Sequence, residues 1–290
     1  MTSCSENLPE LRRARPFLGT VVEIAVPSTS DALGSLEHAF ARIARVHALM
    51  SAHDQTSDLG RLQAAAVGES VRVHPWTWRV LAAALRLNRL TAGAFDPVAA
   101  GRLALARGDL PIWPGREPAR ASGCTDIELL SLHRVRLRRA LRIDLGGIAK
   151  GFAVDQAVRS LKRDGLPWGL VNAGGDLRAF GSRAWPIHTR HPAHPTELVS
   201  LGMLWEGAIA TSAPYFSERM NQGQSVSALA NPHTGRSIVG AISATVFAPT
   251  CLVADALTKA VLLNRAAHAL RACRARAIIL ALEENARHAA

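Results

Sequence analysis

The sequence feature that most constrains this chain is the stretch RIDLGGIAKGFAVD at residues 142–155, where two adjacent glycines separate two apolar segments. The pattern predicts a strand that ends at Asp144, a tight turn, and a helix over residues 148–163. Adjacent glycines let the backbone approach a ligand closely, and N–H groups at a helix start attract phosphate, to which Lys150 would add positive charge. The spacing matches neither GxGxxG nor GxxxxGK[ST], and a packing turn explains the same residues, so phosphate binding is one of two interpretations.

The lysine at position 150 stands out because, of 34 basic residues, only Lys150, Lys162 and Lys259 are lysines. The formal net charge is +11, but proteins that bind nucleic acid usually cluster their basic residues and interleave aromatic ones. Aromatic residues make up only 5% of this chain, and it contains no known nucleic-acid motif. We therefore expect no nucleic-acid partner. The basic run at residues 134–139 is interpreted as the solvated face of a strand, with an anionic partner as the alternative.

Periodic segments along the rest of the chain predict an α+β fold, with helices and mixed strands in one continuous body. The predicted helices cover residues 31–50, 75–90, 148–163 and 249–263, and a final helix precedes the last strand. The predicted strands cover residues 17–26, 127–132, 135–137, 141–143, 169–172, 177–180, 185–188, 198–201, 208–211, 242–247 and 277–282. Residues 106–126 carry Gly, Pro and Asp without a period, which predicts an irregular connection.

Nothing in the sequence indicates a membrane span or an export signal. No apolar run reaches the roughly 18 residues that a membrane helix needs. The N-terminal segment carries charged residues where a signal peptide has its apolar core, namely Glu6, Glu10, Arg12, Arg13 and Arg15. The four cysteines form no CxxC pair, which is typical of reduced thiols. We therefore expect a cytoplasmic protein without a transmembrane segment.

Three further segments place glycines or an acid at positions suited to a ligand. Residues 171–177, VNAGGDL, predict two strands joined by a glycine bend, and residues 94–97, AFDP, place an aspartate after a helix stop. The last of the long predicted helices carries Asp255, Thr258 and Lys259 on one face. Each segment also has a simpler interpretation, respectively a hairpin bend, an Asp-Pro turn and an i,i+4 ion pair.

Together with LGT at residues 18–20 and ATS at residues 210–212, these segments in this order resemble the ApbE family of FAD:protein FMN transferases. The strongest match is DLGGIAKGFAVD, and the chain resembles a divergent member of the family. The resemblance implies a single ApbE-like domain over residues 16–282, an N-terminal tail over 1–15 and a C-terminal tail over 283–290. It also implies the fold: two interlocked lobes of mixed sheet and helices with a nucleotide cleft between them.

The resemblance further implies which residues contact FAD, the substrate of the family. Leu18 would touch the flavin nucleotide, and His53 would lie in a loop near it. Asp144 and Lys150 would flank the nucleotide. The expected FAD-binding set is completed by Ala94, Phe95, Asp96 and Ala230.

Mg²⁺ is the cofactor that the resemblance implies, held by the carbonyl of Gly147, by Asp255 and by Thr258. The residue that the family commonly has four places after this aspartate is threonine, where this chain has Lys259. A protonated lysine cannot ligate magnesium. Either Thr258 supplies the oxygen, or Lys259 replaces part of the metal's charge, and both interpretations stay open.

The activity that the resemblance implies is transfer of FMN from FAD to a threonine of an acceptor flavoprotein, so FAD and that acceptor are the expected partners. The threonine hydroxyl would attack the phosphorus on the FMN side of the pyrophosphate, and AMP would leave. A magnesium ion that bridges the phosphates would stabilise the charge on the leaving AMP.

One family segment departs from its usual pattern. HxxDPxTG reads ALANPHTG at residues 228–235, with Ala228 in place of the histidine and Asn231 in place of the aspartate. His233 either substitutes for the missing histidine or is a solvent-facing turn residue. The departures keep two alternatives open: an FAD-binding protein without transfer activity, serving as a flavin carrier or sensor, and an FAD pyrophosphatase.

Overall fold

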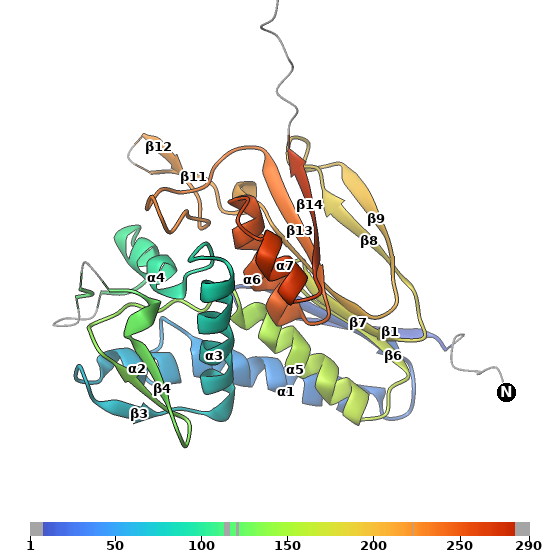
Figure 1. The fold of residues 1–290 in the computed structure, drawn as a ribbon. Helices are drawn as coiled ribbons and strands as arrows, with labels where there is room; N and C mark the ends of the chain where they lie inside the picture. Colours follow the sequence, from blue (N-terminus) through green and yellow to red (C-terminus); the bar gives the residue numbers. More distant parts are fainter. Residues whose placement is uncertain (1–7, 113–116, 120–121, 222, 282–290) are drawn as a thin grey trace, which may run out of the picture.

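A seven-stranded sheet forms the larger of two lobes in this computed structural model, which describes residues 8–112, 117–119, 122–221 and 223–281 (Figure 1). Its strand order is β1-β2-β6-β7-β10-β13-β14. The strands are β1 Glu10–Phe17, β2 Thr20–Pro27, β6 Trp168–Ala173, β7 Asp176–Gly181, β10 Gly207–Ser212, β13 Ile242–Ala248 and β14 Arg276–Ala281. Each neighbouring pair of strands is antiparallel. The sheet is therefore not the mixed sheet of parallel and antiparallel pairs that was expected. Strand patterns carry no information on direction, which the connections decide.

Helices cover one face of this sheet and a hairpin covers the other (Figure 1). The covering helices are α1 Ala32–Met50, α5 Ala149–Arg163, α6 Cys251–Leu262 and α7 Ala267–Ala272, and α1 packs along α5. On the opposite face lies the hairpin of β8 Trp185–Arg190 and β9 Leu198–Leu204, where Trp185 packs edge to face on Trp168 at 5.9 Å between ring centroids. None of the described helices is both long enough and apolar enough to span a bilayer.

The second lobe packs against the same helical layer. It contains α2 Asp58–Ala64, α3 Pro75–Leu90, α4 Pro97–Ala106 and a small sheet in the order β3-β5-β4, of Ser70–Arg72, Arg134–Leu137 and Ile127–Leu130. The remaining short elements are η1 Cys124–Asp126, η2 Pro214–Phe216 and the hairpin of β11 Arg219–Asn221 and β12 Gln224–Val226. A single cluster of buried apolar side chains runs through both lobes, from Ile24 of β2 to Leu81 of α3. The predicted α+β class with two interlocked lobes is therefore confirmed.

The first strand begins inside the segment expected to be an N-terminal tail. Strand β1 starts at Glu10 and pairs with β2 along its whole length. Its arginines interrupt the alternation of apolar and polar residues that signals a strand, and they suit an exposed edge strand. Arg12, for example, pairs with Glu23 across the two strands. Residues 1–7 of the expected N-terminal tail, the expected C-terminal tail at 283–290 and residue 282 lie outside the described residues.

Other differences from the sequence prediction are local. Helices α2 and α4 fall in segments for which neither a helix nor a strand was predicted, and their N-caps, Ser57 and Asp96, accept the first free backbone N–H groups. These helices are short, so their apolar period is too brief to stand out. Residues 141–143 do not form the predicted strand; Ile143 N–H donates instead to the side chain of Gln63 at 2.7 Å.

Helices α5 and α6 cross at an unusually close point. A Cβ on Gly151 would lie 2.2 Å from the carbonyl oxygen of Cys251, so the crossing excludes every larger residue. Each helix also supplies a carboxylate to the start of the other. Asp155 of α5 accepts from the N–H groups of Cys251 and Leu252 at 2.9 and 3.0 Å, and Asp255 of α6 accepts from Gly151 N–H at 3.2 Å. Carboxylates at helix N-termini satisfy unpaired donors and favour the helix dipole.

We predict that Gly151→Ala lowers the free energy of unfolding by about 2 kcal/mol or more, because the added methyl group overpacks the helix crossing. Urea unfolding followed by circular dichroism measures the change. Gly34→Ala is the matched control, since Gly34 lies exposed in helix α1 with nothing within 4 Å of an added Cβ. That variant should gain about 0.5–1 kcal/mol from helix propensity. Equal effects of the two substitutions would contradict the steric argument.

Candidate functional site

Two adjacent cavities lie between the lobes and form one cleft. Their volumes are about 330 and 530 Å³, and they share five lining residues: Arg107, Asp144, Gly146, Lys150 and Ala228. Each cavity also has apolar walls of its own, which include Phe95 and Leu103 in the smaller one and Leu18, Val46 and Met50 in the larger. The cleft therefore has two apolar ends and a charged middle, which suits a ligand with two ring systems and an anionic link.

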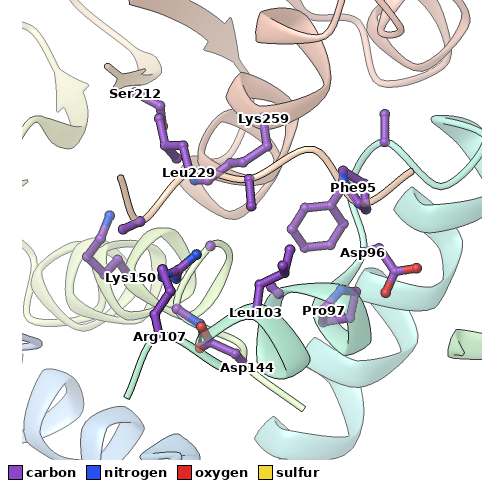
Figure 2. A pocket seen from close by; sticks show the side chains of 17 residues that line it. Phe95, Asp96, Pro97, Leu103, Arg107, Asp144, Lys150, Ser212, Leu229 and Lys259 are labelled. Atoms are coloured by element: carbon purple, nitrogen blue, oxygen red, sulfur yellow. Dashed lines mark hydrogen bonds between the residues drawn. The ribbon is translucent and has the colours of Figure 1, made fainter. Parts of the chain in front are cut away.

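The structure brings most of the expected site residues to this cleft. Ala94, Phe95, Asp96, Gly147 and Ala230 line the smaller cavity. Leu18 and His53 line the larger cavity. Asp144 and Lys150 line both. In Figure 2 the side chains of Arg107, Asp144 and Lys150 lie on one side of the smaller cavity, and those of Phe95, Asp96 and Pro97 lie on the other. Asp255 and Thr258 are fully buried and line neither cavity.

Local backbone features place several of these residues. Leu18 has φ +56° in the turn between β1 and β2, a conformation that L-residues rarely adopt. Asp144 Oδ1 accepts from Gly146 N–H at 2.7 Å and so stabilises the glycine turn. Asp96 Oδ1 caps helix α4 through Val98 N–H at 2.8 Å. Capping of helix α4 is enough to explain an aspartate at position 96, so this residue does not by itself indicate a ligand.

Two carboxylates and two ammonium groups form a charge cluster below the cleft, made of Lys150, Asp176, Asp255 and Lys259. Lys150 pairs with Asp176, and its Nζ lies 4.0 Å from Asp255 Oδ1. Lys259 Nζ donates to the backbone oxygen of Asp255 at 2.8 Å and to its Oδ1. The Asp255 and Asp176 side chains are 0% and 3% exposed, whereas those of Lys150 and Lys259 are 31% and 20% exposed. The acids are thus buried, whereas both lysines are partly exposed and line the smaller cavity.

Burial and charge act in opposite directions on this cluster. Burial and the nearby charge of Asp255 raise the pKa of Asp176, and Lys150 offsets only part of this. Burial also opposes ionisation of Asp255, but the ammonium groups of Lys150 and Lys259 outweigh it and lower its pKa. Burial likewise opposes the charge on Lys150, whose pKa is nevertheless raised by Asp255 and Asp176. Asp255 is therefore a carboxylate, and Lys150 an ammonium, near neutral pH.

The groups expected to hold magnesium do not fit a divalent ion in this arrangement. Thr258 Oγ1 donates to the backbone oxygen of Asp255 at 2.7 Å and lies 2.7 Å from Ser212 Oγ, so it is already engaged below the cavity. Lys259 donates a hydrogen bond to the carboxylate of Asp255. Its side chain also packs over Gly147, since a Cβ added to Gly147 would lie 3.2 Å from Cε of Lys259. Among the described residues no group of three or more His, Cys, Asp or Glu side chains is placed to hold a metal.

Comparison with known proteins identifies the fold. The profile of the ApbE family matches residues 18–281. This chain belongs to the ApbE family. It is similar to the FAD:protein FMN transferases of Vibrio cholerae, 29% identical over 278 residues, and of Haemophilus influenzae, 27% identical over 288 residues; each match covers 89% of this chain and 82% of the relative. The crystal structure of the ApbE protein from Thermotoga maritima has a TM-score of 0.81 at 27% identity and covers 93% of this chain and 94% of that one.

Two residues of this ApbE site are absent from the set expected from the sequence: Arg107, which lines both cavities, and Asp176, which is buried beside Lys150 and lines neither. Asp176 ends the glycine bend NAGGD, which the sequence marks as a bend but not as the partner of Lys150. Arg107 lines both cavities, and its Nε donates to Asp109 at 2.7 Å. The sequence does not distinguish Arg107 from the other arginines, because arginines are spread along the whole chain. For Asp176 the signal was present in the motif, whereas for Arg107 only the fold supplies it.

The departures in residues 228–235 have distinct consequences. Ala228 lines both cavities, so the cleft meets a methyl group at the position of the family's histidine. Asn231 keeps the turn, because its Oδ1 accepts from His233 N–H at 2.9 Å as a carboxylate would. His233 is exposed, and its ring lies beside Gly93 outside both cavities. The solvent-facing interpretation of His233 therefore fits the structure.

We predict that Lys150→Met lowers the free energy of unfolding by about 3 kcal/mol at pH 8, because it removes an ammonium group from two buried carboxylates. The loss should shrink at pH 5. Without Lys150 the pKa of the buried carboxylates rises above the unfolded value, so the folded variant takes up a proton that the unfolded chain does not, and its stability increases as pH falls. Urea titrations of both proteins at the two pH values measure this.

Lys162→Met is the control for this prediction, since Lys162 pairs with the exposed Glu206 on the surface. Its effect should stay below about 1 kcal/mol at either pH. A loss for Lys150→Met that is the same at both pH values would show that the ammonium does not compensate the two acids.

Proposed function

We propose that this protein transfers FMN from FAD to a threonine of an acceptor flavoprotein and releases AMP. The observation that carries the proposal is the cleft itself, with cationic side chains between two apolar cavities in an ApbE family fold. The Vibrio cholerae and Haemophilus influenzae relatives bear the name FAD:protein FMN transferase and match most of this chain. FAD has the matching chemistry, because its two ring systems are joined by a pyrophosphate.

The two cavities suggest how FAD lies. The smaller cavity, with Ala94, Phe95 and Ala230, suits the adenine, and the larger one, with Leu18 and His53, suits the bulkier flavin. The pyrophosphate then lies across the shared middle of the cleft. There Lys150 and Arg107 provide positive charge and hydrogen-bond donors, and Asp144 holds the turn below it.

The proposed reaction transfers the phosphoryl group that carries the flavin from the AMP part of FAD to the threonine oxygen. The threonine oxygen forms a bond to the phosphorus that carries the flavin, and the bond from this phosphorus to the bridging oxygen breaks. The bridging oxygen leaves with AMP, which gains one negative charge, and the threonine proton passes to AMP or to water. Positioning and charge neutralisation supply most of the catalysis in phosphoryl transfer. Lys150, Arg107 and Lys259 supply that charge here.

Ala228 favours a second candidate function. If the histidine of the family pattern assists removal of the threonine proton, a chain with a methyl group there would bind FAD without transfer or cleave it with water.

A cytoplasmic location and the absence of a nucleic-acid partner also stay predictions. The magnesium site of Gly147, Asp255 and Thr258 is not carried into this proposal, because Lys259 engages the carboxylate of Asp255 and Ser212 engages the hydroxyl of Thr258.

We predict that purified protein incubated with FAD and a flavoprotein acceptor yields an acceptor with the added mass of bound FMN and an equal amount of AMP. Mass spectrometry detects the adduct, and chromatography detects AMP. The control is the same acceptor with its target threonine replaced by valine, which should give neither product. AMP without an adduct would identify a pyrophosphatase, and FAD retained intact would identify a carrier.

The orientation of FAD gives a separate prediction. Phe95→Ala should weaken binding of AMP roughly tenfold and leave binding of FMN unchanged, because one buried side chain contributes about this much. Leu18→Ala should do the reverse. Calorimetric titration of each variant with AMP and with FMN measures both effects, and urea unfolding checks that each variant is folded. If Phe95→Ala weakens FMN and spares AMP, the assignment of the two cavities is reversed.

A further inference from the structure

We propose that the ammonium group of Lys259 takes the place of a divalent cation in this protein, so that FAD is bound and cleaved without Mg²⁺. The inference rests on the proposed function, since it concerns the same cleft. It starts from the disagreement described above between the expected magnesium ligands and the contacts that these residues make. Lys259 lines the smaller cavity, whereas Thr258 does not.

The position of the ammonium supports this role. Lys259 lies one helical turn after Asp255, and its Nζ donates both to the backbone oxygen and to the Oδ1 of that residue. It reaches this point across Gly147, because an added Cβ there would lie only 3.2 Å from Cε of the lysine and 3.7 Å from Nζ. The glycine thus leaves a slot for the lysine stem. A cation therefore already lies beside the Asp255 carboxylate and close to Gly147.

The charges of the cluster are balanced without a metal. Asp176 and Asp255 are buried, and each carries an ammonium partner, Lys150 and Lys259 respectively. A divalent ion bound to Asp255 would have to displace Lys259 and would then repel it at short range. A buried charge that is already paired and hydrogen-bonded gains little from such an exchange. The cluster therefore selects against Mg²⁺ while keeping positive charge at the cavity.

The ammonium also keeps a donor for a ligand. A lysine ammonium has three N–H donors, and in the part of the chain that the structure describes two of them meet Asp255. The remaining donor is available to a phosphate oxygen in the smaller cavity, which Lys259 lines. When AMP leaves, its new negative charge would form near this group and near Lys150. The lysine can thus stabilise the leaving group as a bound cation would.

The test compares wild-type protein with Lys259→Thr, which shortens the side chain and opens the position of the ammonium. Electron paramagnetic resonance of Mn²⁺ measures metal uptake by the protein without FAD. FAD affinity and AMP release are then measured in EDTA and in excess MgCl₂. We expect wild type to take up no Mn²⁺ stoichiometrically and to change less than about twofold between EDTA and MgCl₂, since its own ammonium neutralises the charge.

The variant should behave in the opposite way. Lys259→Thr should bind Mn²⁺ in stoichiometric amount, and its FAD affinity and AMP release in EDTA should fall by roughly tenfold or more and recover in MgCl₂. Lys162→Thr is the matched control, because Lys162 belongs to a surface pair with Glu206, and it should follow wild type in every measurement. Circular dichroism establishes that each variant is folded.

Several results would overturn the inference. Stoichiometric Mn²⁺ uptake by wild type, or loss of its AMP release in EDTA, would show that a metal is bound despite Lys259. A folded Lys259→Thr that takes up no Mn²⁺ would show that the ammonium does not occupy a cation position. If neither protein binds FAD, the proposed function fails, but the Mn²⁺ measurement on the protein alone still decides the role of the lysine.

Discussion

The close crossing of helices α5 and α6 is the constraint on which the rest of this structure depends. Gly151 allows the backbones to meet, and the exchange of Asp155 and Asp255 between the two helix starts holds them there. Asp155 also pairs with Arg178 of strand β7, which ties the crossing to the large sheet. Lys150 in the first turn of α5 and Lys259 in the last turn of α6 both line the smaller cavity beside this crossing.

The same acids that organise the fold also organise the chemistry. Asp255 accepts a hydrogen bond from the start of α5 and, with its other oxygen, from Lys259. A carboxylate this deeply buried is tolerated only when it is paired and hydrogen-bonded. The structure satisfies that requirement with the ammonium groups of two lysines that also line the smaller cavity. Stability of the helix pair and positive charge at the proposed pyrophosphate position are therefore linked through the same residues.

Membership of the ApbE family accounts for the scaffold, and the departures from its pattern are concentrated at the cleft. Asn231 preserves its turn through the same type of side-chain acceptor, so that substitution is structurally neutral. Ala228 and Lys259 instead change what a ligand in the cleft would meet. One removes a titratable ring, and the other brings a fixed positive charge. These two positions, rather than the fold, are where the cleft of this chain departs from the pattern that it resembles.

The sequence by itself determined the long amphipathic helices, the glycine turn at Asp144 and the order of motifs that led to the family, because periodicity and turn chemistry are local properties. Only the tertiary structure decided that Asp255 lies at Gly151, 104 residues away, that Asp176 partners Lys150, and that Lys259 points to the cleft while Thr258 turns below it. Such contacts depend on how helices α5 and α6 and strand β7 pack together. No pattern within any of these segments carries that information.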